Sequence, residues 1–251
     1  MNGRSTGFAG PLSAWQIVVL AGGVLTVARI IILFQANYEL GPDEAQYWDW
    51  SRNFAFGYFS KPPMIAWVIG LTTGLCGDAE ACIRVSSPLI YFATSLLLFA
   101  LARDLYDAKI GILAAAAFIT LPGVSFSSGL ASTDVPLLFF WCAALFSFNR
   151  FLETGKTSWG TAFGTALGLG ILSKYAMVYF LLCALVYFLL APQQRKKLPT
   201  EGSLVAGVVA LLFFLPNIIW NMRNDFPTFS HMAANASLGT EWFNPGNVVD
   251  F

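Results

Sequence analysis

The stretch AWQIVVLAGGVLTVARIIILF at residues 14–34 decides the fold class, because it is apolar over the length of a membrane-spanning helix. Arg29 is the one charged residue within it. No clear small-residue cleavage site follows, so we interpret it as an uncleaved membrane anchor rather than a signal peptide. Further apolar runs predict spans at 86–102, 110–126, 135–151, 159–173, 175–191 and 203–220.

The composition of the whole chain indicates lipid as its solvent. Of 251 residues, 57% are hydrophobic and 11% charged, and the mean hydropathy is +0.64. Soluble domains carry about 25% charged residues, so a small soluble enzyme is all but excluded. A disordered chain is excluded as well, because the apolar content is too high. The net charge is zero and there is no basic patch, so we expect no nucleic-acid partner.

The apolar stretch 63–76 has only 14 residues, which favours an interfacial or re-entrant helix over a span. The distribution of Lys and Arg decides between the two. If 63–76 does not span, eight of these residues fall in the cytoplasmic segments and five outside. If it spans, the split becomes four against nine, which breaks the positive-inside rule.

The sequence therefore predicts an all-α, polytopic transmembrane helix bundle of about seven spans. Residues 1–251 form one domain, and 35–85 form the first outer loop with a short interfacial helix. The odd number of spans suggests a piece of a longer protein. The glycines of 159–173 favour close helix packing, while Cys76 and Cys82 share one loop and could pair in an oxidising compartment, although no framework of cysteine spacings supports a disulfide.

The first outer loop combines acids, aromatic residues and a lysine in ELGPDEAQYWDW (39–50) and FGYFSKPPM (56–64). Taken alone, Asp43 and Glu44 fit a helix cap, and Trp and Tyr commonly line the membrane interface. The predicted topology, however, gathers acids and bases on one side of the membrane, where such residues are costly and usually functional. These residues are Asp43, Lys61, Asp134, Lys174 and His231.

The order of these motifs resembles the amino-terminal part of family 39-type glycosyltransferases. That group belongs to the GT-C membrane class and includes protein O-mannosyltransferases and lipid A aminoarabinose transferases. The resemblance covers roughly residues 14–235. Its motifs are DEAQYW (43–48), SKPP (60–63), Arg84, STD (132–134), LGILSKY (169–175) and NDFPTFSHM (224–232).

The resemblance implies a role for each site residue. Asp43 would be the catalytic base, Glu44 would support it or help bind a divalent ion, and Asp134 would be a second acid. Lys61 would bind the lipid-linked phosphate. Further substrate-binding candidates are Lys174, Arg84, which could instead shape the site, and Tyr58.

The resemblance also implies that a divalent metal ion could be a cofactor. In aminoarabinose members a metal lies between a histidine and a Glu that precedes the Lys-Pro pair. Here Ser60 stands at the position of that Glu, so His231, the single histidine, is a metal-ligand candidate without this partner.

These features predict a glycosyltransferase that uses a polyprenyl-phosphate sugar on the periplasmic face of a bacterial inner membrane. The expected acceptor is lipopolysaccharide, lipid A or another envelope glycan, with protein less favoured. The alternative is a transporter or flippase of a lipid-linked substrate. That class predicts charges near the bilayer midplane, where this chain has only Arg29, and paired broken helices in a half-repeat, of which the sequence shows no sign.

Overall fold

A computed structural model describes residues 12–36, 38–195 and 199–235. The regular elements among these residues are all helices, with no strand. The predicted all-α class is confirmed. The helices are α1 Ala14–Gln35, α2 Pro42–Ser51, α3 Met64–Cys76, α4 Glu80–Arg84, α5 Ser86–Leu105, α6 Ala108–Thr120, α7 Pro122–Ser127, α8 Asp134–Thr154, α9 Thr157–Ser173, η1 Tyr175–Met177, α10 Val178–Leu190, α11 Pro192–Arg195, α12 Thr200–Arg223 and α13 Pro227–Asn235.

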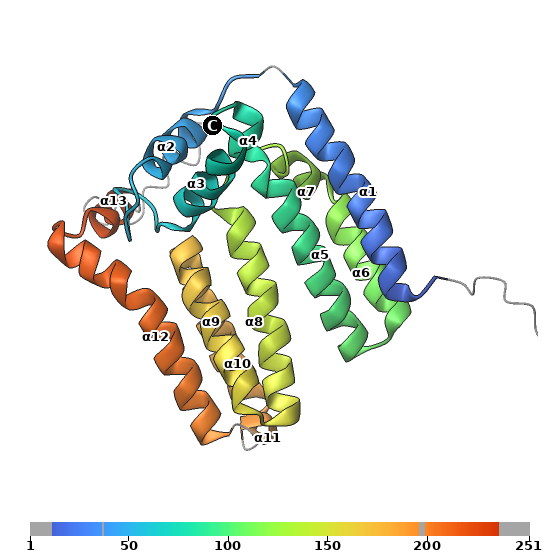
Figure 1. Cartoon of the computed structure of the whole chain (residues 1–251). Coiled ribbons are helices and arrows are strands. Elements are labelled where there is room, and N and C mark those ends of the chain that lie inside the picture. The colour runs from blue at the N-terminus through green and yellow to red at the C-terminus, as the bar shows by residue number, and fades with distance from the viewer. Residues whose placement is uncertain (1–11, 37, 196–198, 236–251) are drawn as a thin grey trace, which may run out of the picture.

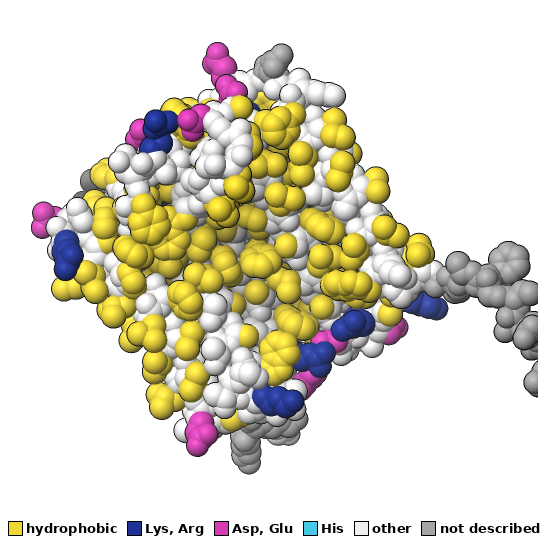
Figure 2. Space-filling model, in the orientation of Figure 1, with side chains coloured by type: hydrophobic (Ala, Val, Ile, Leu, Met, Phe, Trp, Pro, Cys, Tyr) yellow, Lys and Arg dark blue, Asp and Glu magenta, His cyan; other side chains and the backbone are white. Residues whose placement is uncertain are grey.

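Six of the seven predicted spans overlap one long helix each, whereas the predicted span 110–126 is divided between α6 and the short α7, which begins at Pro122. Four stretches of the described chain are long and apolar enough to cross a membrane: α1, α4 with α5, α8 and α12. The shorter α6, α9 and α10 run beside them (Figure 1). Figure 2 shows hydrophobic side chains over the middle of the bundle and most charged side chains near its two ends. The chain is a multi-pass membrane protein.

The connections of the bundle separate into two ends (Figure 1). The end that carries α2, α3, α4 and α13 is called the site end below, and the end that carries α11 is called the opposite end. The predicted interfacial helix is α3, which packs against α2 and α4 at the site end instead of running the length of the bundle.

Small residues bring α9 and α12 together along their length. A Cβ atom added at Gly160 would overlap the backbone of Gly202, and one added at Gly164 would overlap the backbone of Ala206. Glycines four residues apart lie on one face of a helix, so this face of α9 is flat enough for direct backbone contact. The prediction that the glycines of 159–173 serve close packing is confirmed.

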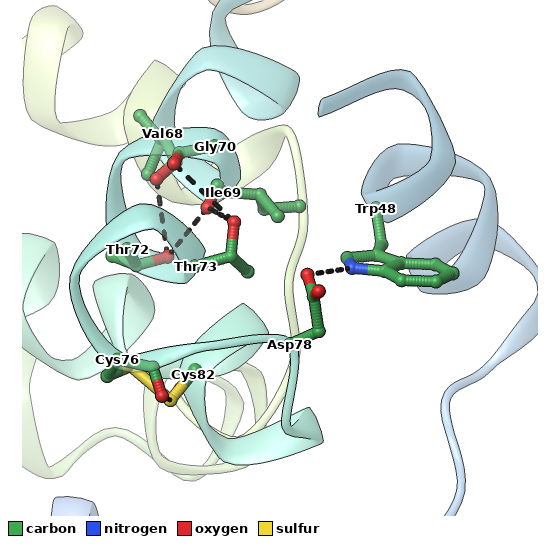
Figure 3. The surroundings of a disulfide bond; sticks show 9 residues. All are labelled: Trp48, Val68, Ile69, Gly70, Thr72, Thr73, Cys76, Asp78 and Cys82. Carbon is green, nitrogen blue, oxygen red and sulfur yellow. Dashed lines mark hydrogen bonds between the residues drawn. A yellow bond between two sulfur atoms is a disulfide. The ribbon is translucent and has the colours of Figure 1, made fainter. Parts of the chain in front are cut away.

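A disulfide joins Cys76, at the end of α3, to Cys82 in α4 (Figure 3). The pairing that the sequence left without support is thus present in the structure. Beside it, the indole Nε1 of Trp48 donates to Asp78 Oδ1 over 2.9 Å, which ties α2 to the loop between α3 and α4 (Figure 3). The disulfide and this hydrogen bond therefore connect α2, α3 and α4 to one another.

Candidate active site

Asp43 and Glu44 are neighbours in the first turn of α2, but their side chains have different environments. Gly41 precedes the helix and Pro42 opens it, a position where the missing N–H of proline costs nothing. Glu44 turns back, and its Oε2 accepts a hydrogen bond from the N–H of Gly41 over 3.0 Å. Asp43, one residue earlier and about 100° around the helix, stays exposed.

Glu44 and Arg84 form a buried ion pair beneath α2. Arg84 donates from Nε to Oε1 over 2.8 Å and from Nη2 to Oε2 over 2.7 Å, and both side chains are almost fully buried. The N–H of Ala131 also donates to Oε1 over 2.8 Å. Burial alone would raise the pKa of Glu44, but the hydrogen bonds from Arg84, Ala131 and Gly41 outweigh it and hold the pKa below its ordinary value.

The same guanidinium ties the pair to the segment that leads into α2. Arg84 donates to the carbonyl oxygens of Tyr38 and Glu39 over 3.2 and 2.9 Å, and its guanidinium lies 4.2 Å from the ring centroid of Tyr38. Arg84 therefore fits the site-shaping role that the resemblance offers, because its donors already face Glu44 and backbone carbonyls. The role of Glu44 as an ion ligand stays a prediction, since its carboxylate already accepts four hydrogen bonds.

An open pocket of about 410 Å³ lies between the start of α2 and the segment before α8. Asp43 and Tyr47 line it from α2, and Ser132 lines it from the facing segment. Burial, together with the negative charges of Asp43 and Asp134, raises the pKa of Tyr47 to about 12. The phenol is therefore protonated at neutral pH and can donate a hydrogen bond inside the pocket.

Tyr47 is a site residue that the sequence analysis did not select. A signal for it exists, because Tyr47 follows Asp43 by four residues and such residues share one face of a helix. Its ring also packs with Ile65, Ile69 and Ile83 in a buried cluster beneath α2. Tyr47 thus belongs to both the core of the site end and the wall of the pocket.

Lys174 and Asp134 lie together at the rim of the site end. The Nζ atom of Lys174, directly after α9, is 2.7 Å from Oδ1 of Asp134 in the first turn of α8. The two side chains are 37% and 51% exposed. An ion pair so open to solvent contributes little to stability, so Lys174 can exchange the carboxylate for an incoming phosphate at low cost.

The loop between α2 and α3 carries Lys61 and is shaped by Tyr58. The ring of Tyr58 stacks on Trp50 with 4.9 Å between centroids, and its hydroxyl bonds to the carbonyl oxygens of Trp50 and Asn53. Burial raises the pKa of Tyr58. The hydroxyl of Tyr58 is already engaged in these hydrogen bonds to the loop, so its predicted contact with substrate stays a prediction. Within the described residues, the half-buried Lys61 has no ion pair.

His231 lies on α13, where its ring centroid is 5.1 Å from that of Phe59. Throughout the ranges that the structure describes, no three His, Cys, Asp or Glu side chains come close enough to hold a metal ion. The described residues therefore supply no complete ligand set for a metal ion. Metal binding by His231 stays a prediction.

Comparisons with known proteins identify the family of this chain. Residues 60–220 match the family model described as dolichyl-phosphate-mannose-protein mannosyltransferase. The lipid A galacturonosyltransferase RgtD of Rhizobium johnstonii is 38% identical over 82% of this chain and 43% of its own length. An undecaprenyl phosphate-alpha-4-amino-4-deoxy-L-arabinose arabinosyl transferase of Pseudomonas paraeruginosa is 28% identical over 86% of this chain and 40% of its own length. The chain thus spans less than half of these curated relatives.

Two solved structures share the fold. ArnT from Cupriavidus metallidurans, bound to undecaprenyl phosphate, superposes with a TM-score of 0.71 at 21% identity, over 86% of this chain and 43% of ArnT. The Pmt1–Pmt2 protein O-mannosyltransferase complex of S. cerevisiae, bound to its sugar donor, gives a TM-score of 0.60 at 16% identity, over 88% and 34%. At these identities the likeness establishes the fold alone.

Proposed function

The chain belongs to the dolichyl-phosphate-mannose-protein mannosyltransferase family, and we propose that the protein transfers a sugar from a polyprenyl phosphate to a lipid acceptor of the bacterial envelope. The observation that carries this proposal is the gathering, at one end of a membrane bundle, of a pocket lined by the exposed carboxylate of Asp43 and of the solvent-exposed Lys174, which pairs with Asp134 two residues beyond the pocket lining. The acid suits proton transfer, and the lysine suits a phosphate leaving group.

In the proposed reaction, Asp43 takes the proton from a hydroxyl of the acceptor. The hydroxyl oxygen attacks the anomeric carbon from the face opposite the phosphate. The bond between that carbon and the phosphate oxygen breaks, so the configuration inverts and polyprenyl phosphate leaves as an anion. Lys174 and Lys61 stabilise the leaving phosphate, and the protonated Tyr47 donates a hydrogen bond within the pocket.

The site end is proposed to face the periplasm. The Lys and Arg distribution along the sequence supports this orientation, and so does the disulfide between Cys76 and Cys82 at the site end, since disulfides persist in oxidising compartments. The donor's polyprenyl chain reaches such a site through the bilayer, with its phosphate at the membrane surface.

Relatives suggest the substrates. The 38%-identical relative is named a lipid A galacturonosyltransferase, and the arabinosyl transferases are named for undecaprenyl phosphate donors. We therefore propose a lipid A or lipopolysaccharide acceptor, with undecaprenyl-phosphate galacturonate as the first donor to test.

A transfer assay in detergent micelles tests the proposed function and separates it from lipid transport. Purified protein is incubated with undecaprenyl-phosphate galacturonate and lipid A, and the lipids are analysed by mass spectrometry. We expect lipid A to gain the mass of one sugar residue, because transfer needs no sealed compartment. A protein that forms no product in micelles but moves the lipid-linked sugar across sealed vesicles would be a transporter instead.

A further inference from the structure

Two asparagines lie fully buried in the last two turns of α12. Asn217 and Asn221 are 0% exposed, although α12 is one of the apolar helices long enough to span the membrane. They are four residues apart and share one face of the helix. Burying an amide is costly unless it is hydrogen-bonded, and an apolar side chain would pack here without that cost. Their hydrogen bonds therefore indicate what the pair holds in place.

Asn217 joins two segments that carry phosphate-binding candidates. Its Nδ2 donates to the carbonyl oxygen of Phe56 over 2.6 Å, in the loop that leads to Lys61. Its Oδ1 accepts from the hydroxyl of Tyr175 over 2.8 Å, in the turn that directly follows Lys174. One amide thus bonds to the loop on one side and to the turn on the other.

Asn221 supports this amide from the next turn of α12. Its Nδ2 donates to the carbonyl oxygen of Asn217 over 3.0 Å and lies 3.4 Å from the hydroxyl of Tyr175. Pro216 stands just before Asn217 and breaks the regular helix hydrogen bonding, and α12 bends in its upper part (Figure 1).

Packing and a second hydrogen bond attach the same loop to the same end of the bundle. Gly57 lies against the indole of Trp220, so closely that a Cβ atom at this position would overlap the ring. The hydroxyl of Thr228, at the start of α13, donates to the carbonyl oxygen of Tyr58 over 2.8 Å. The loop is therefore fixed by three contacts that all lie outside the pocket.

We propose that Asn217, with Asn221 and Tyr175, is a positioning node that fixes the Lys61 loop relative to the Lys174 turn and so sets the affinity for a polyprenyl phosphate headgroup. These are positioning residues, because they act through the two lysines. The inference rests on the proposed function, in which both lysines bind the donor phosphate. It adds Asn217 and Asn221, which neither the family motifs nor the pocket includes.

The decisive variant is Asn217→Asp. Its carboxylate keeps an acceptor for the Tyr175 hydroxyl and, when ionised, has no proton to donate to the Phe56 carbonyl, so the bond to the loop is lost. Asn217→Leu, which cannot donate in any protonation state and adds no buried charge, is measured beside it. We expect the Kd of the purified protein for undecaprenyl phosphate to rise about tenfold, with the binding stoichiometry unchanged. General damage to the fold would instead lower the stoichiometry and leave the Kd of the remaining sites as it was.

Two control variants separate positioning from stability. Asn224→Ala removes a matched, exposed amide that, among the described residues, donates to the Trp220 carbonyl of its own helix, and it should leave the Kd unchanged. Gly164→Ala disturbs the contact of α9 with α12 far from the node and should lower thermal stability without raising the Kd. If Gly164→Ala raises the Kd as much as Asn217→Asp does, the node is only structural and the inference is overturned.

A distance measurement tests the node without any ligand. Spin labels at Phe59→Cys in the loop and Tyr179→Cys on α10, in a Cys183→Ser background, report the spacing of the two segments. We expect a narrow distance distribution in the parent and a broadened one with Asn217→Asp. An unchanged distribution overturns the inference. If the Asn217→Asp distribution broadens but neither the variant nor the parent binds undecaprenyl phosphate, the node positions the two segments as proposed and the proposed function is wrong.

Discussion

Asp43→Asn is expected to lower sugar transfer by about 10²- to 10⁴-fold, the usual contribution of a general base. The amide is nearly isosteric with the carboxylate but cannot accept the proton of the acceptor hydroxyl. Because Asp43 is exposed at the pocket and holds no buried contact, the thermal stability of the protein should not change. The Kd for undecaprenyl phosphate should also be unchanged, since Asp43 is not assigned to the phosphate.

Asp49 provides the matched control for this prediction. It is exposed on the same helix and lies outside the pocket, so Asp49→Asn should retain full transfer. Transfer is measured by mass spectrometry of the acceptor lipid. If Asp43→Asn stays active and Asp134→Asn does not, the base is Asp134, and the assignment of Asp43 is wrong.

Arg84→Leu is expected to give the largest loss of stability of any change at the site end. It leaves the Glu44 carboxylate buried without its cation, and breaking a buried ion pair in this way costs about 3–5 kcal/mol. The free energy of unfolding in detergent measures the effect. Arg52→Leu is the control, because Arg52 pairs with Asp78 over 3.6 Å in the open, where such a pair contributes about 1 kcal/mol or less.

The same ion pair predicts a pH dependence of stability. The pKa of Glu44 is lower in the folded protein than its ordinary value, so the folded state binds this proton less readily than the unfolded chain. The stabilisation is therefore fully present above the ordinary pKa of a glutamate and is lost as the pH falls through the folded value. The temperature at the midpoint of thermal unfolding should fall as the pH is lowered, and this temperature should depend less on pH in Glu44→Gln. An equally steep response in Glu44→Gln would contradict this role.

Local sequence patterns were enough to predict the apolar helices and their approximate bounds, although the predicted span 110–126 is divided into α6 and α7 at Pro122. The apolar run 14–34 became α1, and the short run 63–76 became α3 at the site end, as its length and the flanking charges indicated. The glycines of α9 predicted a close helix contact because their spacing follows the helix repeat. Each of these signals lies within one stretch of about 20 residues.

The contacts that organise the site lie beyond such local patterns. Glu44 meets Arg84 across 40 residues of sequence, and Asn217 meets Phe56 across 161. No periodicity specifies such pairs, so the sequence identified Glu44 and Arg84 as candidates without showing that they bind each other. It did not single out Asn217, because a buried asparagine has no distinctive pattern. It did not single out Tyr47 either, because the spacing of four residues from Asp43 is equally compatible with an interfacial tyrosine.

The measurement that tests the central claim most directly is a cryo-EM structure of the protein with undecaprenyl phosphate. The claim is that the site end binds the lipid phosphate beside the Asp43 pocket. The expected result is phosphate density at the site end within hydrogen-bonding distance of Lys174 or Lys61, with Lys174 released from Asp134. Phosphate density at the opposite end of the bundle, or an intact Lys174–Asp134 pair with the phosphate away from both lysines, would contradict it.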